Sequence, residues 1–157
     1  MYTLFLTLHV VSACVWFGVT PAQLVLRRAS LARRDAPGEV ALMGAFARLA
    51  FVAGNVGGIG IALSGVGLVW AGHLPWFAFG AVPWLATKQT LYVLILAINF
   101  VAVVPTAKRA RALLGAAPAA GAGDEVRSEF ERLHRLGFVI QALVFAALVL
   151  GVSRPSF

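Results

Sequence analysis

Four long apolar segments, separated by short polar stretches, restrict the possible folds of this chain more than any other feature. They lie at about Tyr2–Val25, Leu49–Ala71, Trp84–Thr106 and Leu136–Val152. A helix needs roughly 17–25 apolar residues to cross a bilayer, and all four segments meet that length. A lone strand could not satisfy its backbone hydrogen bonds in lipid, so each segment is predicted to be a helix. The composition agrees, because 61% of the 157 residues are hydrophobic and only 12% are charged.

The connections between these segments are short, which predicts one all-α domain over residues 1–157, an integral membrane four-helix up-down bundle. Nothing basic precedes the first segment, so it is interpreted as a retained span rather than a cleaved signal peptide. The longest connection holds a small-residue linker, Gly115–Gly123. Asp124 and Glu125 then resemble the first turn of a helix, and Glu131 with Arg135 has the i, i+4 spacing of an exposed ion pair. The fourth helix is therefore predicted to begin near Asp124 and to extend into the cytoplasm.

The basic residues are distributed unevenly, and their positions predict the orientation of the chain. Eleven of the thirteen flank the first and third connections: Arg27, Arg28, Arg33, Arg34, Arg48, Lys108, Arg109, Arg111, Arg127, Arg132 and Arg135. The second connection, "GHLPWFAFGAVP", has none. The positive-inside rule places both basic connections in the cytoplasm and both termini outside. The net charge of +7 thus reflects topology, with contact to anionic lipid head groups as a secondary role, and a nucleic-acid partner is not expected.

Several common site types are absent from the sequence. Cys14 is the only cysteine, so no internal disulfide can form, and it is expected to act as a small hydrophobe. No set of residues resembles a zinc site, a nucleophile elbow or a phosphate loop. The stretch "GNVGGIG" lies within a span rather than after a strand, so it does not fit a dinucleotide-binding fingerprint.

The second span instead carries a ridge of small residues formed by Gly54, Gly58, Ala62 and Gly65. Such a ridge allows another surface to approach the backbone closely within a membrane. A neighbouring helix is the favoured partner for the ridge. The alternative is a flat cofactor that lies against it, in which case Gly58 would be a cofactor-binding residue.

His9 in the first span is one of two ionisable residues that stand out within the membrane. Such residues are costly and count as functional candidates. On a helix His9 shares one face with four other residues: Ser12, Trp16, Thr20 and Gln23. This stripe is predicted to face the bundle interior. For Ser12, Thr20 and Gln23 the favoured role is interhelical hydrogen bonding. For His9 that role and ligation of a metal or haem iron both stay open.

Lys88 in the third span is the second such residue, and Tyr92 and Asn99 share its face. Lys88 either extends its ammonium group toward the nearby helix end, as snorkelling lysines do, or takes part in a functional site. His9 and Lys88 are predicted to lie in the same, outer half of the bilayer. Three tryptophans are expected to form an interfacial belt at that edge: Trp70, Trp76 and Trp84.

Two further histidines lie outside the spans. His73, at the outer end of the second helix, is expected either to be solvated or to serve as a second axial ligand opposite His9. His134 precedes the fourth span and is interpreted as a surface residue, too far from His9 to share a metal.

Three stretches together resemble a known family. "LHVVSACVW" places Trp16 seven residues after His9, "PWLATKQTLYVLILAINF" places a tryptophan four residues before Lys88, and the chain ends "GVSRPSF". This pattern resembles HemJ-type membrane proteins, a broader set of uncharacterised four-to-five-helix bacterial membrane proteins and, more remotely, the CopD copper-resistance domain. HemJ-type proteins bind haem b and oxidise protoporphyrinogen IX.

The HemJ resemblance implies that His9 binds haem iron and that Lys88 pairs with a propionate or takes part in proton transfer. Trp16, Gly58 and Tyr92 would line the cofactor, the substrate would be a porphyrin, and the location would be the bacterial inner membrane. The last span departs from the family, because "HRLGFVIQ" stands where the family has an acidic-polar pair.

Two other functions stay open at this point. One is a non-catalytic accessory subunit or assembly factor of a larger membrane complex. The few charges and the glycine-rich helix suit this function, and the chain could also form a homo-oligomer. The other is copper handling, which is less favoured because the chain has two methionines and one cysteine.

Overall fold

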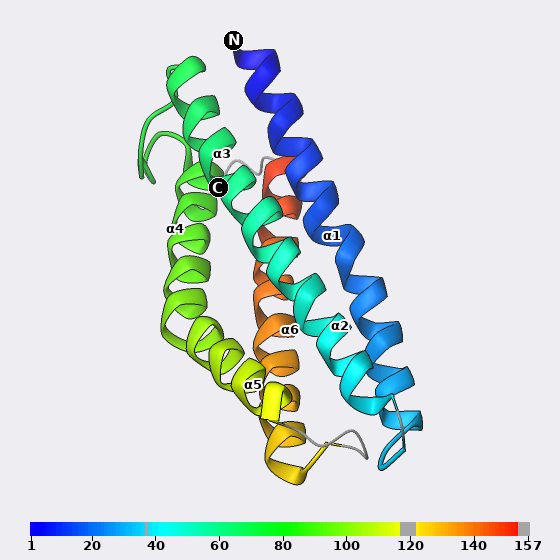
Figure 1. Ribbon diagram of the computed structural model, residues 1–157. Helices are drawn as coiled ribbons and strands as arrows, with labels where there is room; N and C mark the ends of the chain where they lie inside the picture. Colours follow the sequence, from blue (N-terminus) through cyan, green and yellow to red (C-terminus); the bar gives the residue numbers. More distant parts are fainter. Residues whose placement is uncertain (37, 117–121, 154–157) are drawn as a thin grey trace.

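Four long helices make up the computed structural model, which describes residues 1–36, 38–116 and 122–153 (Figure 1). The first is α1 (Tyr2–Ala32), and the last is α6 (Asp124–Ser153). The other two are composite. The second consists of α2 (Glu39–Val52), a π-helical segment η1 (Ala53–Gly58) and α3 (Ile59–Ala71). The third consists of α4 (Pro83–Ile98), a π-helical segment η2 (Asn99–Val103) and α5 (Val104–Ala116).

This architecture confirms the predicted all-helical fold and its four helices long and apolar enough to span a membrane. The start of α6 at Asp124 is also as predicted. The helices run further than the apolar segments, because α1 continues to Ala32 and α2 already begins at Glu39. The predicted linker Gly115–Gly123 lies partly outside the described residues.

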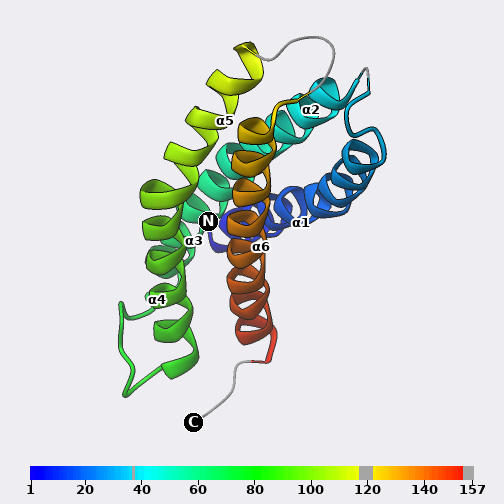
Figure 2. The same ribbon diagram turned by 90° about the horizontal axis from the view of Figure 1, so that it is seen from below.

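The helices associate as two pairs. α1 packs along α2, η1 and α3, and α6 packs along α4, η2 and α5 (Figures 1 and 2). The two pairs are joined through α2 and α5. A cluster of buried apolar side chains lies at this junction: Met43, Phe46, Ala122, Val126, Phe130 and Leu133. The main hydrophobic core therefore sits toward one end of the bundle.

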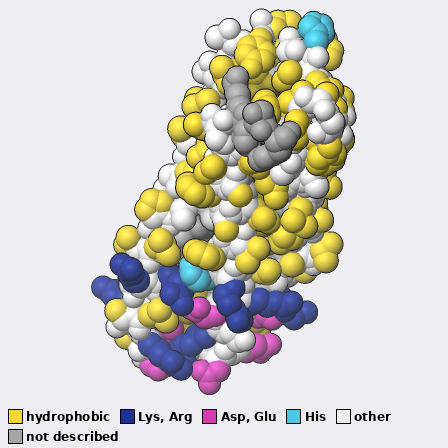
Figure 3. Space-filling model, turned by 180° about the vertical axis from the view of Figure 1, so that it is seen from behind, with side chains coloured by type: hydrophobic (Ala, Val, Ile, Leu, Met, Phe, Trp, Pro, Cys, Tyr) yellow, Lys and Arg dark blue, Asp and Glu magenta, His cyan; other side chains and the backbone are white. Residues whose placement is uncertain are grey.

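Charged side chains gather at that same end, whereas the middle of the molecule is covered by hydrophobic ones (Figure 3). We call this the basic end, because it holds the arginines of the first and third connections. The opposite end holds the connection between α3 and α4, residues 72–82, which has no Lys, Arg, Asp or Glu.

The two π-helical segments have identifiable local causes. Pro105 lies just after η2 and has no N–H, so the carbonyl of Val101 loses its usual donor and the turn widens. η1 contains three glycines in "AGNVGG". There the Asn55 amide donates to the carbonyl of Phe51 at 2.8 Å, which satisfies a backbone acceptor inside an apolar helix.

Candidate functional site

His9 lies half-buried on the face of α1 that packs against α3. Its Nδ1 is 3.0 Å from the hydroxyl of Ser64, a buried residue of α3. The Ser64 hydroxyl donates its one hydrogen to the carbonyl of Gly60 at 2.5 Å. Ser64 can then accept a hydrogen bond from His9 in the tautomer that carries the ring proton on Nδ1. That tautomer has its lone pair on Nε2.

Lys88 belongs to the other helix pair and lies half-buried on α4. It is near enough to His9 for the two side chains to interact electrostatically. A Cβ built on Gly151 of α6 would be 2.9 Å from the Lys88 Nζ, so the ammonium group lies directly against the α6 backbone. The structure thus brings together the two ionisable residues that were predicted to share one half of the membrane.

Trp16 and Tyr92, which with Gly58 were predicted to bind a cofactor, both contact Gly58. A Cβ on the buried Gly58 would lie 2.6 Å from the indole ring of Trp16. The Tyr92 hydroxyl donates to the Gly58 carbonyl at 2.9 Å and so links α4 to η1. By the rise of a helix, Trp16 lies about 10 Å further toward the basic end than His9. These three residues form a packed layer beneath the His9–Lys88 region.

Two members of the glycine ridge, Gly58 and Gly65, lie against side chains of α1, so a neighbouring helix packs on this part of the ridge, as the sequence favoured, whereas a Cβ on Gly54 would meet nothing within 4 Å. Besides Trp16, the side chains of Ser12 and Phe5 fill the positions that a Cβ would take on Gly60 and Gly67. His9 lies beside Gly65 in the same way, with its ring 3.6 Å from that position.

The lower part of the α1 stripe also faces inward. Thr20 accepts a hydrogen bond from Gln141 of α6, which confirms its predicted role between helices. Gln23 is half-buried. The other amide atom of Gln141, Oε1, is buried and has no hydrogen-bond partner in the described part of the chain. Gln141 was not singled out in the sequence, because nothing there indicated that it would face Thr20.

The structure does not bring His73 to His9. His73 is exposed in the turn after α3, with a φ of 51°. The neighbouring Gly72 lies against Tyr2, whereas His9 is seven residues further along α1, about 10 Å by helical rise. Within residues 1–36, 38–116 and 122–153, no three His, Cys, Asp or Glu side chains are grouped so that they could hold a metal ion.

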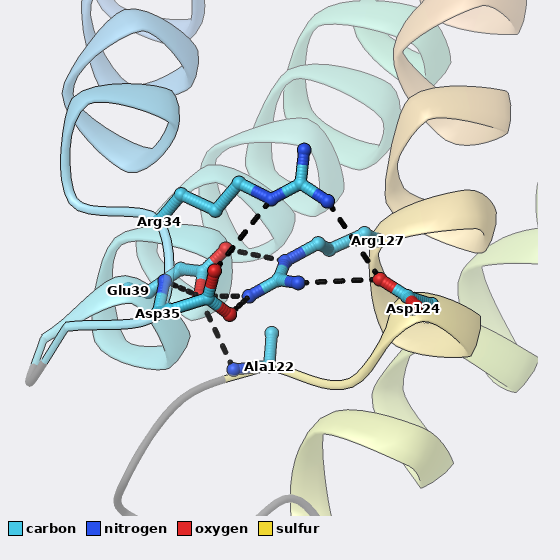
Figure 4. A network of polar contacts seen from close by, with 6 residues as sticks. All are labelled: Arg34, Asp35, Glu39, Ala122, Asp124 and Arg127. Atoms are coloured by element: carbon cyan, nitrogen blue, oxygen red, sulfur yellow. Dashed lines mark hydrogen bonds and ion pairs between the residues drawn. The ribbon is translucent and has the colours of Figure 1, made fainter.

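A network of ion pairs at the basic end was not predicted (Figure 4). Its centre is Glu39, the first residue of α2, which is only 2% exposed. The Arg127 guanidinium donates to both Glu39 carboxylate oxygens at 2.9 Å, and the backbone N–H groups of Asp35 and Ala122 donate to one of them. Arg127 also pairs with Asp35 at 2.5 Å and with Asp124 at 3.3 Å. The network therefore joins the first connection to the start of α6.

These contacts shift the acid–base behaviour of both partners. The hydrogen bonds from Arg127 lower the pKa of Glu39 from 4.5 to about 2, against the opposing effect of its burial. The same hydrogen bonds to Glu39 and Asp35 raise the pKa of Arg127. Glu39 and Arg127 lie among other charged residues outside the apolar spans. One of these residues, Asp124, is 90% exposed. The pair is consequently ionised over the physiological pH range.

Two residues of α6 make contacts that local spacing did not predict. Glu131 forms an ion pair with Arg27 of α1, at 2.8 Å. His134, interpreted as a surface residue, is partly exposed and has its ring 6.0 Å from that of Phe46. Burial and the positive charge of Arg27 lower the pKa of His134, against a smaller effect of Glu131. Both contacts are to helices distant in sequence, which local spacing does not reveal.

Comparison with known proteins identifies a family. The model of the DUF2269 family, described as predicted integral membrane proteins, matches residues 3–155. The chain belongs to this family. The match supports the resemblance to uncharacterised membrane proteins, and it does not point specifically to HemJ-type or CopD proteins. No curated protein and no solved structure matches the chain.

Proposed function

We propose that this integral membrane protein binds haem b through His9. In this proposal it resides in the bacterial inner membrane, with its basic end in the cytoplasm and both termini outside. The uneven distribution of arginine and lysine supports the orientation. The hydrogen bond between His9 and Ser64 is the observation that supports haem ligation.

The donor set at His9 fits an iron ligand. Histidines that ligate metals commonly donate their other ring N–H to a fixed partner, which orients the ring. Ser64 does this for His9, and the resulting tautomer presents the Nε2 lone pair that iron requires. Because α1 packs on the ridge at Gly58 and Gly65, the ligand would have to approach from a side other than this part of the ridge.

Lys88 supplies the second feature that a porphyrin needs. Haem propionates are anionic, and a cation is the group that would compensate them within an apolar span. Lys88 lies near His9 from the other helix pair, so one ligand could contact both. In this proposal Lys88 is the residue that holds a propionate or moves a proton. Trp16, Gly58 and Tyr92 act below it as the packed layer that excludes water.

Bound haem supplies one-electron redox chemistry, and the chain tunes it through axial ligand and burial. The fourth span lacks the acidic-polar pair of HemJ-type proteins. We therefore propose haem binding first. Oxidation of a porphyrinogen substrate is the specific activity to assay once haem binding has been established.

The visible spectrum of detergent-purified protein, oxidised and reduced, tests this proposal. Wild type is expected to show a b-type Soret band that is lost in His9→Ala. Ser64→Ala should retain the ligand but lower haem affinity by about tenfold or more, as for other residues that orient a ligand. His73→Ala is the matched control, because His73 is exposed and distant from His9, and its spectrum should equal that of wild type. An unchanged spectrum in His9→Ala, or no Soret band in wild type after haem addition, would overturn the proposal.

A further inference from the structure

Arg111 lies against an exposed phenyl ring at the basic end, and Arg48 lies about one helical turn from that ring on the same helix. The Arg111 guanidinium of α5 lies over the ring of Phe51 in α2, with 4.7 Å between its central carbon and the ring centroid. Arg48 precedes Phe51 by three residues, and residues at this spacing are neighbours on a helix surface. Two exposed arginines from two helix pairs thus flank the position of Phe51.

Nearby acidic residues do not neutralise these two arginines. The ion pairs of the described residues join Asp35, Glu39, Asp124, Glu129 and Glu131 to other arginines: Arg27, Arg34, Arg109 and Arg127. Neither Arg48 nor Arg111 takes part in any of them, and both side chains are exposed. Like charges brought together without an acid favour the binding of an external anion.

The position of the pair along the bundle indicates which anion. Arg48 is the last charged residue before an uncharged stretch that runs to residue 87. On the membrane side of the two arginines the surface is apolar and open. Phe51 is 53% exposed, Val52 44%, Phe100 67% and Val101 79%. An anionic group at the arginines with hydrocarbon beyond it matches the structure of a phospholipid.

We propose that Arg48, Arg111 and Phe51 form a binding site for one anionic phospholipid at the cytoplasmic surface. The two guanidinium groups bind the lipid phosphate and its charged head group, because guanidinium forms paired hydrogen bonds with phosphate oxygens. The acyl chains lie along the exposed apolar side chains of α2 and η2. This site lies at the junction of α2 and α5, so the lipid joins the two helix pairs from outside.

Native mass spectrometry of the full chain in detergent, titrated with phosphatidylglycerol, tests the site. The double variant Arg48→Gln/Arg111→Gln should bind phosphatidylglycerol at least about tenfold more weakly, which corresponds to about 1.4 kcal/mol. The matched control is Arg132→Gln/Arg135→Gln, which removes the same charge from two exposed arginines of α6. The control should bind phosphatidylglycerol as wild type does. Phosphatidylcholine should bind weakly to all three proteins.

Three outcomes would overturn the proposal. Equal loss of lipid in both double variants would mean diffuse attraction to surface charge. Equal binding of phosphatidylcholine would mean that charge plays no part. Inorganic phosphate that binds the wild type as tightly as the lipid would mean that the arginines hold a free anion.

An Arg48→Lys/Arg111→Lys variant keeps the charge and checks folding. It should retain more lipid than the glutamine variant, and a lysine variant no better than the glutamine one would also contradict the proposal.

Discussion

The basic end and the opposite half of the bundle are held together by different kinds of contact. At the basic end, ion pairs centred on Glu39 and Arg127 cover a core of aromatic and aliphatic side chains around Phe46 and Phe130. In the opposite half, α1 and α3 approach closely because side chains of α1 lie against glycines. Hydrogen bonds between helices there include those of His9 with Ser64 and of Tyr92 with Gly58.

The difference follows from the surroundings of each region. Charged groups outside the apolar spans keep part of their hydration, so an ion-pair network can form there at a tolerable desolvation cost. Within lipid, apolar burial gives no driving force between helices, and stability comes from close packing and a few hydrogen bonds. The candidate site lies in this second region. His9 and Lys88 are therefore costly where they are, which favours a functional role for them.

Replacing Glu39 should have the largest effect on stability, because it removes the centre of the basic-end network. Glu39→Ala leaves two backbone N–H groups without their acceptor and removes one partner of Arg127, which keeps its ion pairs with Asp35 and Asp124. Loss of hydrogen bonds to a buried charged group typically costs about 1.5–3 kcal/mol. Reversible unfolding in mixed micelles would measure the loss. Glu125→Ala is the control, since Glu125 is exposed and takes no part in the ion pairs of the described residues. Similar losses in the two variants would contradict a special role for the network.

Acid should weaken the same region. Glu39 has a folded-state pKa of about 2, below its ordinary value of 4.5, so the folded protein takes up this proton less readily than the unfolded one. Its contribution to stability is fully present above pH 4.5 and is lost as the pH falls toward about 2. The melting temperature of wild type should drop over this interval more than that of Glu39→Gln, which cannot titrate. Parallel curves for the two proteins would show that Glu39 does not carry the dependence.

The features of the fold that the sequence predicted correctly depend on local pattern. Apolar length located the four helices, and the acidic turn at Asp124 located the start of α6. Helical periodicity also predicted that the stripe from His9 to Gln23 faces inward, and the small-residue ridge predicted a helix partner. In these cases one segment contains all the information that decides the outcome.

The features that the sequence missed depend on which distant segments meet. Glu131 has Arg135 at ideal helical spacing, yet it pairs with Arg27 because α1 passes beside it. Glu39 gave no local signal, since its partner Arg127 is 88 residues away. No local pattern linked Tyr92 to Gly58, and the hydrogen bond between them joins two helices. Haem binding itself stays a prediction.

Close packing in the half that holds the candidate site can be tested with two glycines of η1. A Cβ at Gly58 would come within 2.6 Å of the Trp16 ring, whereas a Cβ at Gly54 would meet nothing within 4 Å. Both substitutions change the backbone entropy of the same segment equally. The difference between Gly58→Ala and Gly54→Ala therefore isolates the steric cost, which for overpacking is about 1–3 kcal/mol. Gly58→Ala should lower the unfolding free energy by that amount relative to Gly54→Ala. It should also shift the fluorescence of Trp16, which can be measured in a variant whose other tryptophans are replaced by phenylalanine. Equal stability of the two variants would mean that α1 can move away from η1 at little cost. The half that carries His9 would then be held by its hydrogen bonds rather than by packing.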